Sequence, residues 1–122
     1  MTPESNCWLR RLGFYVWYVP GISRAWRLDF ASRDHLLVTD VGGYDLPGTG
    51  GPYASILVLS TGAATELHSC LNGTIELVDW VERTIQLYIP RSRQVDRAMD
   101  TMRSFRRAEE RRSQLRWLLS RR

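Results

Sequence analysis

The chain contains no lysine, because all 17 of its basic residues are arginine. It therefore lacks the lysine that a Walker A loop, a Schiff-base enzyme or a pyridoxal-phosphate site needs. Only two cysteines are present, Cys7 and Cys70, which excludes a framework of several disulfides. One bridge between them stays open as an alternative, and two buried thiols are the favoured interpretation. No window approaches about 18 uncharged apolar residues, so no membrane-spanning segment is expected.

No secretory signal is expected in this sequence. Arg10 and Arg11 precede the apolar run 12–19, but this run is short and no small-residue cleavage site follows it. We therefore expect a cytoplasmic protein. What is present is ordinary for a globular protein: 122 residues, 43% hydrophobic and 25% charged, enough for one small domain with a single core.

The charge is divided unevenly along the chain. Residues 1–90 hold six arginines and nine acidic residues, a net charge of −3, whereas residues 91–122 hold eleven arginines and four acidic residues, a net charge of +7. This division predicts an α+β body over 1–90 and a basic C-terminal helix over 91–122, within one domain. Such asymmetry indicates either an acidic partner or a basic segment that folds back on its own body.

Hydrophobic periodicity predicts a mainly antiparallel sheet. The clearest strand contains Trp26, Leu28 and Phe30, which alternate with Arg27 and Asp29. Short connections between the strands favour an antiparallel meander. The four expected strands cover residues 14–19, 22–30, 35–41 and 54–60.

The strand at 14–19 has two apolar faces, one with Phe14 and Val16 and the other with Tyr15 and Trp17. One face belongs to the core. The favoured interpretation is that a helix covers the other face, because a domain this small needs its aromatic residues for stability. The alternative is a functional face, since aromatic rings beside arginine can stack single-stranded bases.

Residues 63–89 fit two local structures. Asn72-Gly73 could join two strands in a hairpin. Alternatively, a short strand precedes a helix that Thr74 caps and Pro90 stops. We favour the second. The fold class expected is therefore α+β: a four- to five-stranded, mainly antiparallel sheet followed by two helices, the C-terminal one long and Arg-rich.

The C-terminal helix is expected to begin at Ser92 and to run to about Leu119. Its apolar stripe breaks within 106–114, which predicts that the first half packs on the body and that the second half kinks or contacts something else. Local spacing predicts three ion pairs that would cancel part of the charge, and a fully self-paired, solvated face stays open as an alternative. The stripe contains Val95, Ala98, Met99, Met102 and Phe105, and the expected pairs are Asp100–Arg103, Arg106–Glu110 and Glu109–Arg112.

We identify no sequence motif for catalysis, phosphate binding or metal binding. The glycine-rich loop 42–53 lacks both the Walker A and the Rossmann pattern. The two histidines, His35 and His68, form no metal-binding spacing with the two cysteines. We predict no catalytic residue, no metal and no cofactor. The loop remains a candidate binding element, because long loops often carry function.

The sequence thus predicts a non-enzymatic interaction protein that docks on an acidic protein or nucleoprotein, of the size of a small phage or mobile-element inhibitor or adaptor. Direct nucleic-acid binding with weak sequence specificity is the alternative. Self-association into a homodimer and the absence of membrane contact are further expectations. The candidate partner-binding residues are Arg93, Arg103, Arg107, Arg111, Arg116, Trp117 and Leu118 on the helix, with Tyr44, Asp45 and Tyr53 on the loop.

Overall fold

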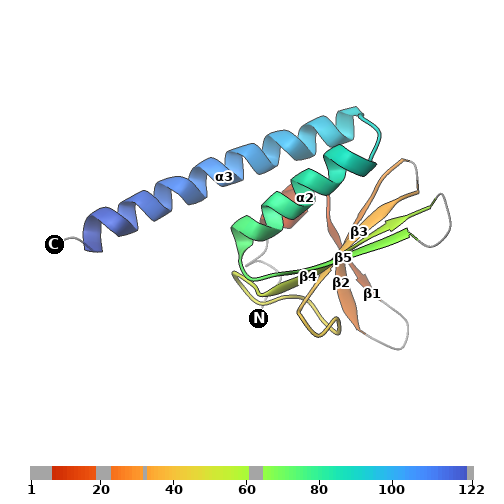
Figure 1. The fold of residues 1–122 in the computed structure, drawn as a ribbon, viewed down its shortest axis with the longest axis horizontal. Coiled ribbons are helices and arrows are strands. Elements are labelled where there is room, and N and C mark those ends of the chain that lie inside the picture. Colours follow the sequence, from red (N-terminus) through yellow and green to blue (C-terminus); the bar gives the residue numbers. More distant parts are fainter. Residues whose placement is uncertain (1–6, 19–22, 32, 61–64, 121–122) are drawn as a thin grey trace.

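The computed structural model describes residues 7–18, 23–31, 33–60 and 65–120. It confirms the expected α+β class, with a five-stranded antiparallel sheet followed by two helices, the last one long (Figure 1). The elements in chain order are α1 (Cys7–Arg11), β1 (Tyr15–Tyr18), β2 (Arg24–Asp29), β3 (His35–Thr39), β4 (Tyr53–Leu59), β5 (Thr65–Leu71), α2 (Thr74–Tyr88) and α3 (Arg93–Ser120).

The sheet is a meander in which each strand pairs with the next along the chain, in the order β1-β2-β3-β4-β5. Trp26 pairs with Val38, and Leu36 pairs with Leu57, so the alternate apolar residues of β2, β3 and β4 share one face. These side chains are fully buried. The alternation that predicted the strands therefore predicted the core face as well.

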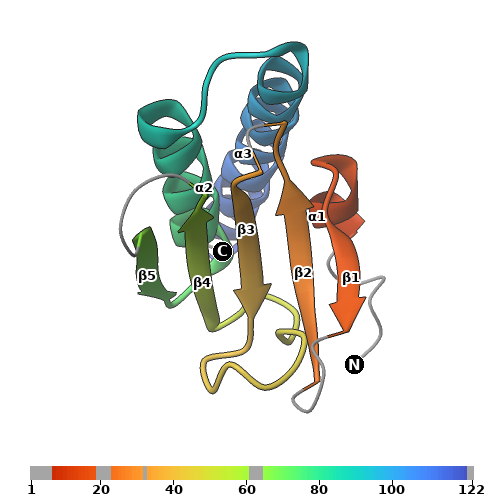
Figure 2. The same ribbon diagram turned by 90° about the vertical axis from the view of Figure 1, so that its right-hand side faces the viewer.

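The three helices lie on that same face of the sheet, so the molecule has two layers (Figures 1 and 2). Val95, Ala98 and Met102 of α3 are buried, as are Val81 and Ile85 of α2. The apolar stripe predicted for the first half of α3 is thus confirmed as its core contact. In the described part of the chain, no helix is both long and apolar enough to cross a bilayer.

The helix ends agree with the sequence to within a residue. The hydroxyl of Ser92 accepts a hydrogen bond from the amide of Val95 at 3.2 Å, which caps α3 as predicted. Between 63 and 89, the strand followed by a helix is confirmed over the hairpin. Gly73, not Thr74, is the N-cap of α2, and the hydroxyl of Thr74 instead lies 3.1 Å from that of Tyr53.

The other face of the sheet carries Tyr15 and Trp17, and none of the described helices covers it (Figure 1). The interpretation that a helix covers this face is therefore wrong for the helices that the structure describes. The guanidinium of Arg27 lies 4.5 Å from the centroid of the Trp17 ring and donates to Asp29 at 2.8 Å. Tyr15 also donates its hydroxyl to Asp29. Asp29 thus neutralises the charge of Arg27 beside these aromatic rings.

The expectation of two buried thiols is wrong for Cys70, which is exposed and free at the end of β5. Cys70 pairs in register with Ala54, opposite the core face, which explains its exposure. The side chain of Cys7 lies outside the described part.

Replacing Met102 by alanine tests how firmly α3 is held. Met102 is fully buried between α3 and the body, so Met102→Ala is expected to lower the free energy of unfolding by about 2–5 kcal/mol. Urea unfolding followed by circular dichroism measures the change. Leu118→Ala on the exposed part of the same helix is the control and should stay within about 0.5 kcal/mol of the parent. Equal effects of the two substitutions would contradict this packing.

His35 makes the stability depend on pH. It lies on β3, on the uncovered face, where burial of its ring and, to a lesser extent, the charge of Arg27 hold its pKa below the ordinary 6.5. The unfolded chain therefore takes up a proton more readily, and stability should fall as the pH drops through about 6.5. Urea midpoints between about pH 7.5 and 5.5 should decrease for the parent protein and decrease less for His35→Gln. His68→Gln serves as the control, and an unchanged pH dependence in His35→Gln would exclude this cause.

Candidate interaction surface

Helix α3 has two halves in different surroundings. The first half packs on α2 and α1, where Phe105 stacks on Trp8 with ring centroids 4.6 Å apart. From Glu110 to Ser120 every residue is exposed, and α3 extends past the end of α2 (Figure 1). We call Glu110–Ser120 the distal end. The helix is continuous through the break in its apolar stripe, so of the two predicted outcomes, a kink or a different contact, the kink does not occur.

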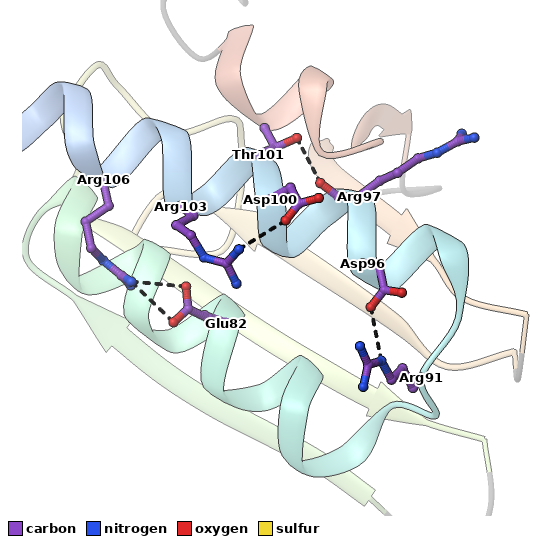
Figure 3. Close-up of polar contacts among 8 residues, drawn as sticks. All are labelled: Glu82, Arg91, Asp96, Arg97, Asp100, Thr101, Arg103 and Arg106. Carbon is purple, nitrogen blue, oxygen red and sulfur yellow. Dashed lines mark hydrogen bonds and ion pairs between the residues drawn. The ribbon is translucent and has the colours of Figure 1, made fainter.

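Arg106 ties the two helices together. Its guanidinium donates to Asp79 at 2.6 Å and to Glu82 at 3.3 Å, both on α2 (Figure 3 shows Glu82). The predicted local pair of Arg106 with Glu110 is therefore wrong, because a tertiary pair with two carboxylates replaces it. These two contacts of Arg106 fix the orientation of α3 relative to α2, and with it the direction in which the distal end projects.

Some of the positive charge of α3 is cancelled within the helix. Arg103 pairs with Asp100 at 3.2 Å and Arg112 with Glu109 at 2.6 Å, as the spacing predicted. Near the start of α3, Arg91 pairs with Asp96 at 3.2 Å. Such exposed pairs contribute little to stability, but they remove these groups from the free positive surface.

Five other arginines of α3, Arg116 among them, form no ion pair with a carboxylate of the described residues. The remaining four are spaced 4, 10 and 4 residues apart, which places them within about 40° of one line along the helix, over a length of about 27 Å. In Figure 3 the side chain of Arg97 points away from the helix pair. We call the four aligned arginines, Arg93, Arg97, Arg107 and Arg111, the outer stripe.

The distal end adds apolar surface beside these charges. Four large side chains there are between 56% and 65% exposed, although residues of this kind are usually buried. The nearby Arg116 has an exposed guanidinium that donates to the backbone oxygen of Arg112, at 3.5 Å. The four apolar residues are Leu115, Trp117, Leu118 and Leu119.

The candidate residues of the glycine-rich loop are separated by the structure. Tyr44 is exposed near the start of the loop. Asp45 accepts two hydrogen bonds from Arg24, at 2.9 and 3.2 Å, and this guanidinium holds the pKa of the Asp45 carboxyl below its usual range. Arg24 thus ties the loop to β2. Tyr53 is fully buried at the start of β4, and burial raises the pKa of its phenol.

The far end of the loop meets α3 at a cavity of about 810 Å³, which we call the α1–α3 groove. Sequence reasoning missed this groove, because its walls come from four segments that are distant along the chain. Its main walls are Trp8 and Arg11 of α1, Thr49 and Gly50 of the loop, and Phe105 and Ala108 of α3, with Tyr53 and Thr74 also lining it. Tyr44 and Asp45 do not line it, so the structure brings only part of the loop to the helix.

The described residues form no metal site. No three histidine, cysteine, aspartate or glutamate side chains among them are close enough to hold a metal ion. The exposed arginines and apolar residues of α3 are the most distinctive surface of the molecule.

Comparison with known proteins gives no match, whether to a protein-family model, to a curated protein or to a solved structure. The function has to be inferred from the surfaces of α3.

Proposed function

We propose that this protein is a non-enzymatic interaction protein that docks on an acidic protein surface through the outer stripe and the distal end of α3. The observation that carries the proposal is the combination of four guanidinium groups without carboxylate partners in the described residues and four exposed large apolar side chains on one projecting helix. Buried aromatic residues and arginines contribute most of the binding free energy in protein interfaces.

The positive charge of the outer stripe determines what kind of partner this surface would bind. The outer stripe presents positive charge along about 27 Å of helix, so carboxylates at matching positions would form charge-assisted hydrogen bonds with it. Arginine can hold a carboxylate with two parallel bonds, which adds geometric specificity. Trp117 and Leu118 would then be the apolar anchors that exclude water from these contacts.

A nucleic acid is the second candidate, because successive stripe arginines four residues apart are separated by about 6 Å along the helix axis, a spacing that can follow a phosphate backbone. Two features favour a protein instead. The exposed leucines have no apolar counterpart on a phosphate backbone. In addition, the amide of Gln94 donates to the backbone oxygen of Asp29 at 2.7 Å, which leaves Gln114 as the one side-chain amide of α3 that could read a base.

Substitutions on α3 test the protein-binding proposal. We expect a partner purified with the tagged protein from its native host to bind Arg111→Glu and Trp117→Ala at least about tenfold more weakly than the parent, by calorimetry. Arg83→Glu and Leu87→Ala are the matched controls, because both residues are exposed on α2. Partner affinity that is unchanged in both α3 variants would overturn the proposal.

A gel-shift titration separates the two candidates. If all four stripe arginines contact phosphates, affinity for duplex DNA should fall about 100-fold between about 50 and 200 mM salt. We expect the protein to shift neither DNA nor single-stranded RNA at low salt. A shift that has this salt dependence and is lost in Arg111→Glu would support the nucleic-acid function instead.

A further inference from the structure

One face of α3 runs from the α1–α3 groove into the distal end. Thr101, Phe105, Ala108 and Arg112 line the groove at spacings of four, three and four residues. The same alternation continues to Leu115 and then Leu119. Alternate spacings of three and four residues keep side chains on one face of a helix and are the pattern by which two helices pair in a coiled coil. We call these six residues the seam.

The two halves of the seam have complementary shapes. In the groove half, the stacked rings of Trp8 and Phe105 and the loop residues around Gly50 border a cavity of about 810 Å³. In the distal half, Leu115 and Leu119 are 60% and 65% exposed. A single chain therefore carries an apolar projection and a groove along one line of one helix, and the helix is too straight to fold its own end back into the groove.

We infer that two copies of this chain form an antiparallel dimer through the seam, each copy placing Leu115 and Leu119 in the α1–α3 groove of the other. The interface is isologous, with the two-fold axis near Arg112. In this register Leu119 of one copy lies opposite Phe105 of the partner subunit, and Leu115 lies opposite Ala108 of the partner subunit. The dimer uses both grooves and both distal ends, so neither copy has a free groove for a third chain.

A parallel arrangement does not use these surfaces. It would bring the groove halves of the two seams together, although α1 and the loop stand beside the seam there. It would also leave the leucines to pair only with each other. The antiparallel arrangement instead moves each distal end toward the body of the other copy, where the cavity lies.

Charge supports the same register. Glu109 lines the groove, and only 19% of its side chain is exposed. In the antiparallel pair it would lie near Arg116 of the partner subunit while keeping its own bond to Arg112, 2.6 Å long. That bond also compensates the two Arg112 side chains that meet near the axis. Over the whole chain, residues 1–90 are net acidic and residues 91–122 net basic, so each basic distal end would approach an acidic body.

The proposed dimer would bury Leu115 and Leu119 of the distal end, and it leaves the outer stripe, Trp117 and Leu118 for the partner of the proposed function. The outer stripe runs beside the seam, and none of its four arginines lines the groove or belongs to the seam. A dimer would display two such stripes to an acidic partner. Loss of the dimer and loss of partner binding are measured separately and by different variants.

Light scattering coupled to size exclusion tests the association. The parent protein should have twice the 14.2 kDa mass of one chain at micromolar concentration. Leu115→Asp and Leu119→Asp should raise the dimer dissociation constant at least about tenfold and give the monomer mass. Leu87→Asp, which changes a leucine that is 67% exposed on α2, is the control and should remain dimeric. A parent protein that is monomeric up to millimolar concentration overturns the inference, as does a dimer that both seam variants retain.

Cysteine cross-linking tests the direction of the pair. In a background with both native cysteines replaced, Cys7→Ser and Cys70→Ser, Arg112→Cys should form a disulfide-linked dimer on mild oxidation, because this position lies near the axis. Leu119→Cys alone should form none, since its two copies lie at opposite ends of the seam. Efficient cross-linking of Leu119→Cys would demonstrate a parallel pair and would overturn the arrangement. A charge reversal gives an independent check: Glu109→Arg should weaken the dimer, and adding Arg116→Glu should restore it.

Discussion

The burial of the first half of α3 against the body determines where every other feature of this surface lies. Val95, Ala98 and Met102 enter the core, and Arg106 holds α2 through two carboxylates. No glycine or proline follows Pro90, so the helix has no residue that would readily bend it. A rigid element fixed at one end must project at the other. The distal end is thus placed by packing that occurs more than one helical turn away from it.

This division also explains why one helix carries two kinds of arginine. Arg106 lies where α3 meets α2, and its desolvation is compensated by Asp79 and Glu82. The outer stripe faces water, where an unpaired guanidinium keeps its hydration and costs the fold little. The free chain can therefore retain this surplus charge with little loss of stability. The same charges become significant when a surface with the opposite charge excludes that water.

Much of the fold follows from periodicity in the sequence. Alternation at Trp26 and Leu28 indicated the core face of β2, and the spacing of Val95, Ala98 and Met102 indicated the buried face of α3. Hydrogen-bonding chemistry predicted the cap at Ser92. These features are local: each depends on residues within two turns of helix or one strand, so a single sequence contains the information needed.

The features that were mispredicted depend on contacts between distant segments. Spacing alone assigned Arg106 to Glu110, but the sequence does not show that α2 brings two carboxylates closer. The sequence placed Tyr53 in the loop, but Tyr53 pairs with Leu71 in the sheet and its ring is buried in the core. The same reasoning covers Cys70, whose exposure depends on which sheet face the helices occupy. Periodicity shows which residues share one face of a strand or helix, but it does not show which other elements cover that face.

The α1–α3 groove is even harder to predict from local sequence patterns, because no single stretch of the sequence contains its walls. It exists where the stacked ring of Trp8, the end of the glycine-rich loop and α3 converge. Gly51 illustrates how closely the loop approaches: its φ is +90°, and a Cβ there would lie 2.7 Å from the ring of Tyr53. Glycine is therefore required for the chain to pass over the buried tyrosine. The glycines of this loop, read from sequence as a sign of a binding element, act at this position by allowing close packing beside the cavity.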